Sequence, residues 1–237
     1  KKPKDTFIQD FNFDNLSLNK ISFDYDKNKK DLIFKNLDLE INKGESICII
    51  GPSGSGKSTL LNLIMGFLEP ISGQIKINNH LDNYENPSWF KKIGYVSQAN
   101  FIIDGTLKSN VALGYEEKEI NNDKVLNCLK LSGLKEFLKS IDFNLNFKLG
   151  EEGKLISAGQ KQRICIARAL YDSPSVLILD EATSSLDKST EIEILDNLLS
   201  KKDGITKIIV THRDIAKSYC DKILDLGVGK LELKNNK

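Results

Sequence analysis

Apolar residues fall into short blocks and alternating runs along this chain, in the manner of β-strands. The segments "KISFDYD" (20–26) and "DLEINKGESICII" (38–50) predict strands, and a Lys-Gly turn interrupts the second. Four further apolar runs, each bounded by polar or turn residues, are also expected to be strands: 73–79, 92–98, 173–181 and 204–213.

Helical spacing of apolar residues occurs between these strands. A glycine-rich turn precedes a helix with inward apolar positions from Leu60 to Met65, and further helices are expected at 160–171 and up to Leu199. From about 101 to 153 the chain is polar and helical in texture, which indicates an inserted helical region. Strands that alternate with helices predict an α/β domain with a largely parallel sheet.

Composition narrows the class of protein. The chain has 237 residues, 40% of them hydrophobic, enough for one large core or two small ones. Its formal net charge of +1 gives no basic excess, so we expect no nucleic-acid partner. The cysteines lie far apart without a Cys-x-x-Cys pair, and we expect reduced thiols instead of disulfides or a zinc site. They are Cys48, Cys128, Cys165 and Cys220.

The segment "GPSGSGKST" fits the pattern G-x-x-x-x-G-K-[ST] between an apolar strand and a helix, the context that a phosphate-binding loop requires. Its glycines let the backbone wrap around phosphates, Lys57 is placed to reach the outer phosphates, and the Ser58 hydroxyl is placed to ligate Mg²⁺. The expected phosphate-binding residues are Gly51, Pro52, Ser53, Gly54, Ser55, Gly56, Lys57, Ser58 and Thr59.

An acidic pair follows the apolar strand "SVLIL". Asp180 is placed to support Mg²⁺, and Glu181 beside it to polarise an attacking water molecule. Such a pair is often only a turn that caps a helix, and the phosphate loop favours the catalytic interpretation.

A second anion-binding turn is predicted in "LISAGQKQR", where small residues follow Ser157 and a helix begins. Backbone N–H groups of such a turn, together with the positive end of the helix dipole, attract a negative charge. A plain helix N-cap at Ser157 is compatible with this interpretation.

Together these motifs resemble the ATPase cassette of ABC proteins over nearly the whole chain. "LISAGQ" is similar to the family signature LSGGQ, with Ile156 in place of leucine and Ala158 in place of the first glycine. If the loop needed a left-handed backbone or a very close approach at Ala158, the alanine would weaken a signature contact. "EATSSLD", ending at Asp187, resembles the family's turn after the acidic pair.

Three further positions take their roles from this resemblance. His212 in "VTHR" matches the switch histidine, although a lone histidine after a buried strand is more often structural. Gln98 in "YVSQ" matches the Q-loop, where it would reach Mg²⁺ and the attacking water, although it could also be a plain strand-end amide. Tyr25, 26 residues ahead of the phosphate loop, matches the aromatic that stacks on adenine.

The resemblance also implies an architecture: a P-loop NTPase (RecA-like) core with a mostly parallel sheet, an N-terminal antiparallel β subdomain and an inserted α-helical subdomain. The expected domain is 1–237, with 20–98 and 160–237 in the β subdomain and core, and 99–159 in the helical subdomain. Trp89 and Phe90 are expected to be core or subdomain-surface aromatics, with contact to a transporter as the alternative.

ABC cassettes pair head to tail, so the signature turn of one closes over the γ-phosphate held by the other. The resemblance therefore implies an ATPase that converts ATP and water to ADP and phosphate as a dimer of two copies, with Mg²⁺. Its implied catalytic residues are Glu181, His212 and Gln98; its metal ligands are Ser58, Gln98 and Asp180. The partner's nucleotide would meet Ser157, Gly159 and Gln160.

Three stretches resemble the exporter type, among them "NFIIDGTLKSNV" and "KLGEEGKLISAGQ", with Glu151 in the place of a family glutamate. Exporter cassettes usually share a chain with their transmembrane helices; this chain shows no apolar run of the roughly 18 residues that span a membrane, and it begins at Lys1. We therefore expect a C-terminal fragment of an exporter or flippase, at the cytoplasmic face of the cell membrane (the inner membrane in a bacterium).

Two alternatives belong to other classes. A soluble ABC ATPase acting on nucleic acid or ribosomes would carry a long inserted coiled coil or two tandem cassettes, and neither pattern is visible here. A degenerate cassette would bind ATP without hydrolysing it, which Glu181 and His212 argue against.

Overall fold

The computed structural model describes residues 11–26, 32–79, 81–82, 87–199, 204–227 and 230–233, so the outer ends of the expected domain lie outside the described residues. The strands are β1 Asn15–Phe23, β2 Phe34–Asn42, β3 Ser46–Ile50, β4 Ser72–Ile77, β5 Leu81–Asp82, β6 Ile93–Val96, β7 Val176–Asp180, β8 Thr206–Val210, β9 Lys222–Asp225 and β10 Lys230–Leu233. The α-helices are α1 Lys57–Met65, α2 Pro87–Phe90, α3 Leu107–Val111, α4 Asn122–Leu131, α5 Lys135–Ser140, α6 Ala158–Tyr171, α7 Lys188–Leu199 and α8 Asp214–Tyr219. Two 3₁₀ turns, Glu117–Glu119 and Glu151–Gly153, complete the helical elements.

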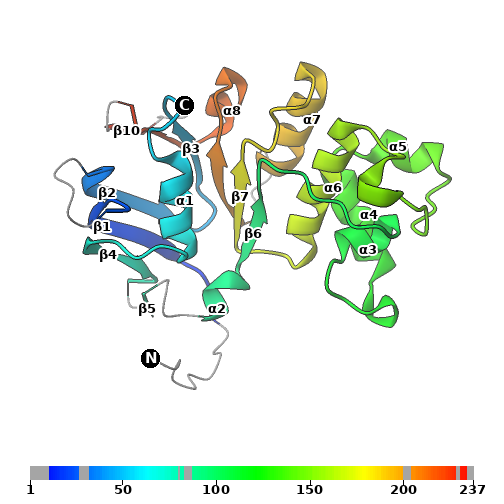
Figure 1. Ribbon diagram of the computed structural model, residues 1–237, viewed down its shortest axis with the longest axis horizontal. Coiled ribbons are helices and arrows are strands. Elements are labelled where there is room, and N and C mark those ends of the chain that lie inside the picture. Colours follow the sequence, from blue (N-terminus) through cyan, green and yellow to red (C-terminus); the bar gives the residue numbers. More distant parts are fainter. Residues whose placement is uncertain are drawn as a thin grey trace.

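The larger sheet has the strand order β10-β9-β3-β8-β7-β6. The five strands from β9 to β6 run parallel to one another. The central strands β3, β7 and β8 are buried along almost their whole length, as expected for a sheet covered on both faces. Helix α1 lies on one side of this sheet, and α6 and α7 lie on the other (Figure 1). Because the strands are parallel, the segments after β3, β7 and β8 meet at one edge.

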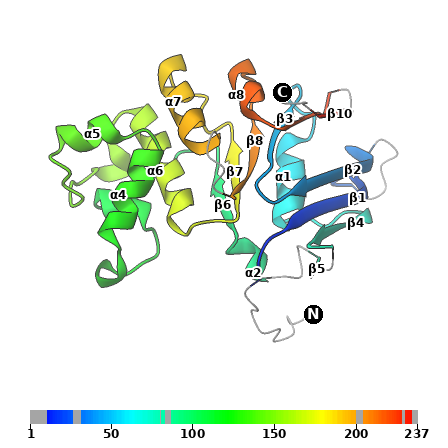
Figure 2. The ribbon, with the colours of Figure 1, turned by 180° about the vertical axis from the view of Figure 1, so that it is seen from behind.

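The smaller sheet is antiparallel, with the order β2-β1-β4-β5. Its buried face packs with α1 and one face of the parallel sheet in a common apolar cluster that includes Leu16, Ile41 and Leu63. Figure 2 shows this sheet beside α1, at the opposite end of the molecule from the helices α3 to α5. The chain passes from one sheet to the other through the Lys43-Gly44 turn, where Gly44 has a φ of 78°.

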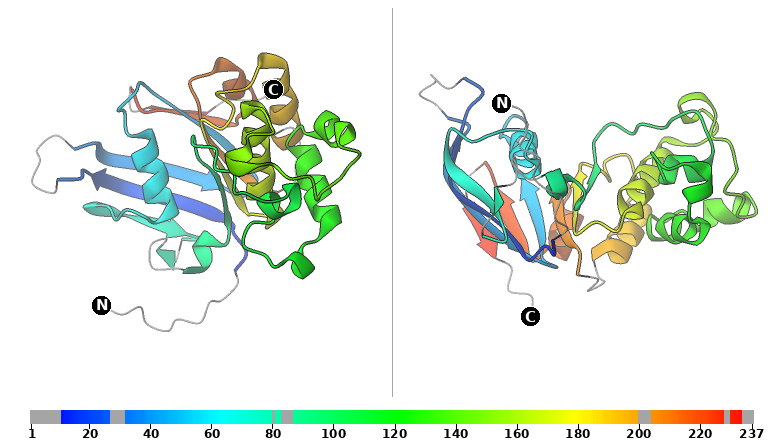
Figure 3. Two further views of the ribbon diagram at one scale, coloured as in Figure 1. Left: turned by 45° about the vertical axis from the view of Figure 1, so that its right-hand side comes forward. Right: turned by 90° about the horizontal axis from the view of Figure 1, so that it is seen from below.

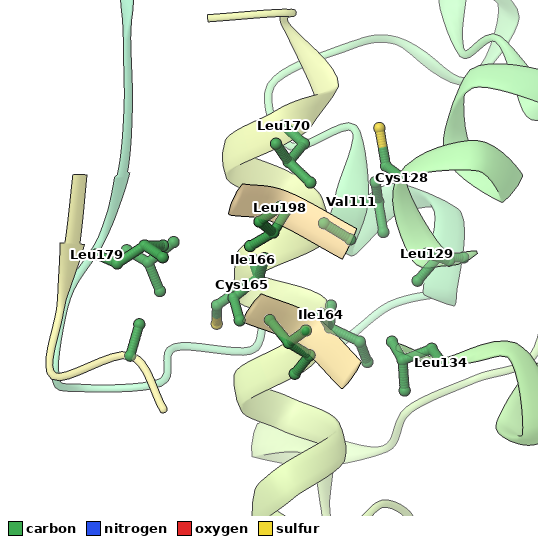
Figure 4. Close-up of a cluster of buried hydrophobic side chains, with 14 of the residues drawn as sticks. Val111, Cys128, Leu129, Leu134, Ile164, Cys165, Ile166, Leu170, Leu179 and Leu198 are labelled. Atoms are coloured by element: carbon green, nitrogen blue, oxygen red, sulfur yellow. The ribbon is translucent and has the colours of Figure 1, made fainter. Parts of the chain in front are cut away.

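Helices α3, α4 and α5 form a separate group that projects away from the two sheets, as the right-hand view of Figure 3 shows. Helix α6 joins this group to the parallel sheet. Figure 4 shows Ile164, Ile166 and Leu170 of α6 between Leu129 of α4 and Leu179 of β7. The second apolar core is therefore shared by the helical insert and the sheet.

The expected α/β architecture, with its parallel sheet, antiparallel N-terminal sheet and helical insert, is confirmed. The apolar helix after the glycine-rich turn is α1, which ends at Gly66 with a φ of 82°. Two short elements, β5 and α2, lie in a polar segment where no element was expected. All four cysteines are free thiols and buried. No helix in the described part of the chain is long and apolar enough to cross a bilayer.

The aromatic pair of α2 divides between core and surface. Trp89 is fully buried, stacks on Phe13 with ring centroids 5.6 Å apart, and donates from its indole N–H to the Ile64 carbonyl. Phe90 is exposed and stacks on Phe67, which is also exposed. The core alternative is confirmed for Trp89, while the exposed Phe90 is compatible with both a subdomain surface and a contact with a transporter.

Candidate functional site

The glycine-rich turn connects β3 to α1 and has the backbone of a phosphate-binding cradle. Gly54 has a φ of 80° and nothing within 4 Å of an added Cβ, so the backbone there faces open space. At Gly51, with a φ of 147°, an added Cβ would lie 2.6 Å from the Ser55 hydroxyl. Glycine is required at both positions for backbone conformation, and at Gly51 also for space.

The cation of this loop lies inside it. Lys57 is buried, and its ammonium donates to the carbonyl oxygens of Gly51 (2.8 Å) and Pro52 (2.9 Å). The Ser55 hydroxyl is also buried and has no hydrogen-bond partner among the described residues. A buried positive charge and an unpartnered hydroxyl in one loop fit an oxyanion ligand.

A cleft of about 420 Å³ opens above the loop. It brings together most of the residues that the sequence assigned to ATP: Tyr25, Ser53, Gly54, Gly56, Lys57, Ser58, Thr59, Gln98, Glu181 and His212, with Ile33 as an apolar addition. Gly51 and Pro52 line an adjoining hollow with His212, and Ser55 lines another.

The Glu181 carboxylate is held between two side chains from different strands. The Gln98 amide, after β6, donates to its Oε2 at 2.9 Å, and the His212 ring, after β8, lies 3.0 Å from its Oε1. Glu181 itself has a φ of 51°, an unfavourable conformation for a residue with a side chain, so the fold holds it against local strain. Glu181 thus contacts two side chains that are far from it in sequence, beside the phosphate loop.

Asp180 ends β7 beside this group. Burial raises the pKa of its carboxyl, while a hydrogen bond donated by the Tyr95 hydroxyl (3.3 Å) lowers it in part. The same environment raises the pKa of Tyr95 to about 12, because the ring is partly buried and faces Asp180. Tyr95 was not predicted from the sequence as a site residue.

The donor set fits a magnesium ion. Ser58 supplies a hydroxyl, Gln98 an amide carbonyl and Asp180 a carboxylate, and Mg²⁺ prefers such oxygen ligands. Ser58 and Gln98 line the same cleft, and the charge of Lys57 acts on Asp180.

Tyr25 stands at the entrance to the cleft with its ring 64% exposed. Its hydroxyl is 3.1 Å from the Thr59 hydroxyl, and its ring meets the edge of Phe23 at a centroid distance of 5.2 Å. Tyr25 is therefore oriented by two contacts and is largely exposed, as an aromatic that stacks on a ligand ring would be.

The second anion-binding turn lies outside this cleft. Ser157 is the N-cap of α6 and forms a capping box with Gln160: the Gln160 N–H donates to the serine hydroxyl at 3.2 Å, and the Ser157 N–H donates to the Gln160 side chain at 2.8 Å. The N-cap interpretation is confirmed. Ala158 is the first residue of the helix and has a negative φ, so the idea that it needs a left-handed backbone is wrong.

Two other residues were not predicted from the sequence, and both hold the turn that follows Glu181. Gln162, fully buried in α6, donates to the Glu181 carbonyl at 3.5 Å. Arg213, next to His212, donates to the Ser184 carbonyl at 2.7 Å. No local pattern marks either residue, because each contact joins segments about twenty to thirty positions apart.

Known proteins are similar to this chain over most of its length. The profile of the ABC transporter family matches residues 34–184. ABC transporter B family member 17 of Arabidopsis thaliana is 38% identical over 212 residues, which cover 89% of this chain and 17% of the relative. Alpha-hemolysin translocation ATP-binding protein HlyB of Proteus vulgaris is 38% identical over 217 residues, 91% of this chain and 30% of the relative. The chain thus spans less than a third of the length of either relative.

Among solved structures, a bacterial Atm1-family ABC exporter with ATP bound superposes with a TM-score of 0.80 and 31% sequence identity. The match covers 93% of this chain and 38% of that one.

Proposed function

The chain belongs to the ABC transporter family as an ATPase domain of the exporter type, and on this premise we propose that it drives movement of a substrate across a membrane by hydrolysing ATP in a head-to-tail dimer. The observation that carries the proposal is the Glu181 carboxylate, held by Gln98 and His212 beside the phosphate loop. This geometry also argues against a cassette that binds ATP without hydrolysing it.

Each copy binds one ATP in its own cleft. Tyr25 stacks on the adenine, and the loop from Gly51 to Thr59 surrounds the phosphates. The Lys57 ammonium turns from the loop carbonyls, which it contacts in this structure, toward the outer phosphates. Bound Mg²⁺, held by Ser58, Gln98 and Asp180, would neutralise phosphate charge.

Glu181 orients the attacking water and accepts its proton. The hydrogen bond from Gln98 and the close approach of the His212 ring hold the carboxylate in place beside the phosphate loop. His212 then donates toward the γ-phosphate, where negative charge develops.

The turn from Ser157 to Gln160 completes the site of the other copy. It lies outside its own chain's cleft, and its hydroxyl and N–H groups at the start of α6 suit a phosphate oxygen. Two ATP molecules therefore join two copies, and hydrolysis releases them.

The conformational change that accompanies hydrolysis passes to a membrane domain at the cytoplasmic face of the membrane. It passes through the segment that follows Gln98. Arg168 of α6 fixes this segment by donating to the carbonyls of Phe101 (2.9 Å) and Asn110 (2.6 Å). We also propose that residues 99–159 form the helical subdomain and that residues 20–98 and 160–237 form the β subdomain and the core.

The test is phosphate release from ATP by the purified chain, with and without Mg²⁺, compared with Glu181→Gln. We expect turnover that needs Mg²⁺ and falls by about 10² to 10⁴ in the variant, because an amide is a poor proton acceptor. Binding of a fluorescent ATP analogue should be unchanged. Turnover near the wild-type rate in Glu181→Gln would remove the proposed role.

A further inference from the structure

The turn from Thr183 to Asp187 joins Glu181 to α7 and is held by side chains on two sides. On one side is Arg213, which directly follows His212. Its guanidinium donates to the Ser184 carbonyl at 2.7 Å and to the Leu186 carbonyl at 3.0 Å. One arginine therefore fixes the backbone of the turn at two points.

A fully buried carboxylate anchors that arginine. Glu191 of α7 is 0% exposed and lies 2.7 Å from the Arg213 guanidinium, and it also accepts a 2.8 Å hydrogen bond from the Thr183 hydroxyl. A buried carboxylate is costly unless it is paired, so Glu191 holds Arg213 in one orientation. The proposed chemistry uses neither Glu191 nor Arg213.

On the other side the same turn contacts α6, the helix that begins at the second anion-binding turn. The Ser185 hydroxyl donates to the Gln162 side chain, which in turn donates to the Glu181 carbonyl. A Cβ added at Gly159 would lie 3.3 Å from Leu186. The turn is thus linked through Gln162 to Glu181, which lines the ATP cleft, and through Leu186 to the start of α6.

We propose that Arg213 and Glu191 are a positioning pair that fixes the turn 183–187 relative to His212, and that this link couples the ATP cleft to the start of α6. The inference rests on the proposed function, since it gives the turn a part in joining the two sites. Neither residue touches ATP: they act through the turn and through His212.

The geometry requires arginine. The planar guanidinium presents donors in several directions, so it reaches the carboxylate and two carbonyl oxygens together. A lysine keeps the positive charge for Glu191, but its single nitrogen cannot span the same three acceptors. Arg213→Lys therefore separates the loss of the positioning contacts from the loss of a buried charge pair.

The experiment compares the wild-type chain with Arg213→Lys and Arg213→Gln. Amide hydrogen exchange of the peptide that contains 183–187 is measured without nucleotide, and kcat and KM for MgATP are measured at one protein concentration. A matched control is Lys222→Gln, which breaks the 2.6 Å Lys222–Glu45 ion pair at the start of β9, the opposite end of that strand from the phosphate-loop edge.

We expect exchange in 183–187 to accelerate about fivefold or more in both Arg213 variants, and kcat to fall about tenfold with KM within about twofold. Arg213→Lys should melt close to the wild-type temperature, so its lower kcat cannot come from unfolding. Lys222→Gln should melt earlier with exchange in 183–187 and kcat unchanged.

Wild-type exchange in 183–187 in folded Arg213→Lys would overturn the positioning role, whatever the turnover. Faster exchange with wild-type kcat would overturn the coupling. If Arg213→Gln does not fold, Arg213→Lys decides alone. A wild-type chain that hydrolyses no ATP would overturn the proposed function, while the exchange result would still decide whether Arg213 holds the turn.

Discussion

The two anion-binding turns of this molecule begin with similar local chemistry and end in different surroundings. The phosphate loop contains the buried Lys57 and faces a cleft whose far wall holds Glu181 and His212. The turn at Ser157 is exposed and closed on itself by a capping box, and it is not among the residues that line the cleft. Of these two described turns, only the phosphate loop has a cation and the proposed catalytic side chains of its own chain beside it.

This difference indicates what each turn requires. In the proposed function the phosphate loop binds a polyphosphate within one copy, because its cation and its walls are already in place. The turn at Ser157 offers donors without a charge, so it suits a phosphate that is already held elsewhere. A second copy supplies that phosphate in the proposed dimer.

The substitution with the largest expected effect on this comparison of the two turns is at Lys57. In Lys57→Ala the loop loses its cation, and ATP affinity should fall about tenfold to a hundredfold. This fall corresponds to the free energy that hydrogen bonds to a charged group contribute to binding. Titration with a fluorescent ATP analogue measures the effect, and an unchanged melting temperature is the control. Equal affinity in the variant and the wild type would contradict the assignment of Lys57.

Ser157→Ala tests the other turn and should have an intermediate effect. Turnover should fall about tenfold, because a donor to a charged phosphate is lost, while ATP affinity of the monomer stays within about twofold. The matched control is Asn121→Ala, which removes the N-cap of α4 and should cost a similar capping energy of about 1 kcal/mol without loss of turnover. If monomer affinity falls as much as turnover, Ser157 acts in its own chain's cleft.

Ala158→Gly should have the smallest effect. Since Ala158 has a helical backbone, glycine gives no relief of strain and should lower the free energy of unfolding by about 0.5–1 kcal/mol. Chemical denaturation measures this change. An ATP-bound dimer tightened by the glycine would instead show that the alanine methyl obstructs close approach to the phosphate.

The phosphate loop could be predicted from the sequence because its chemistry is local. The residues from Gly51 to Thr59 are consecutive, and a strand and a helix fix their geometry. Glu181 was predicted from the acidic pair after an apolar strand, whereas the roles of Gln98 and His212 were implied by the resemblance to ABC cassettes. All three residues follow strands of a parallel sheet, and such segments meet at one edge. Strand β7 was predictable from its apolar run, because its residues are buried up to Leu179. Strand β8 is buried along its whole length.

The contacts that could not be predicted are long-range and polar. Arg213 and Glu191 are 22 positions apart, and Tyr95 and Asp180 are 85 apart. No periodicity links such residues, and their side chains meet only after the sheet has formed. The short strand β5 was missed because its two residues pair with β4 from within a polar segment.

The central claim is that the turn at Ser157 contacts the phosphate of an ATP molecule that a second copy of the chain holds. The most direct measurement is the molar mass of Glu181→Gln by light scattering, with and without MgATP, beside the specific activity of the wild-type chain over a dilution series. We predict a monomer that becomes a dimer with ATP, and a specific activity that rises with protein concentration. A monomer at saturating ATP, with specific activity constant across the series, would contradict the account.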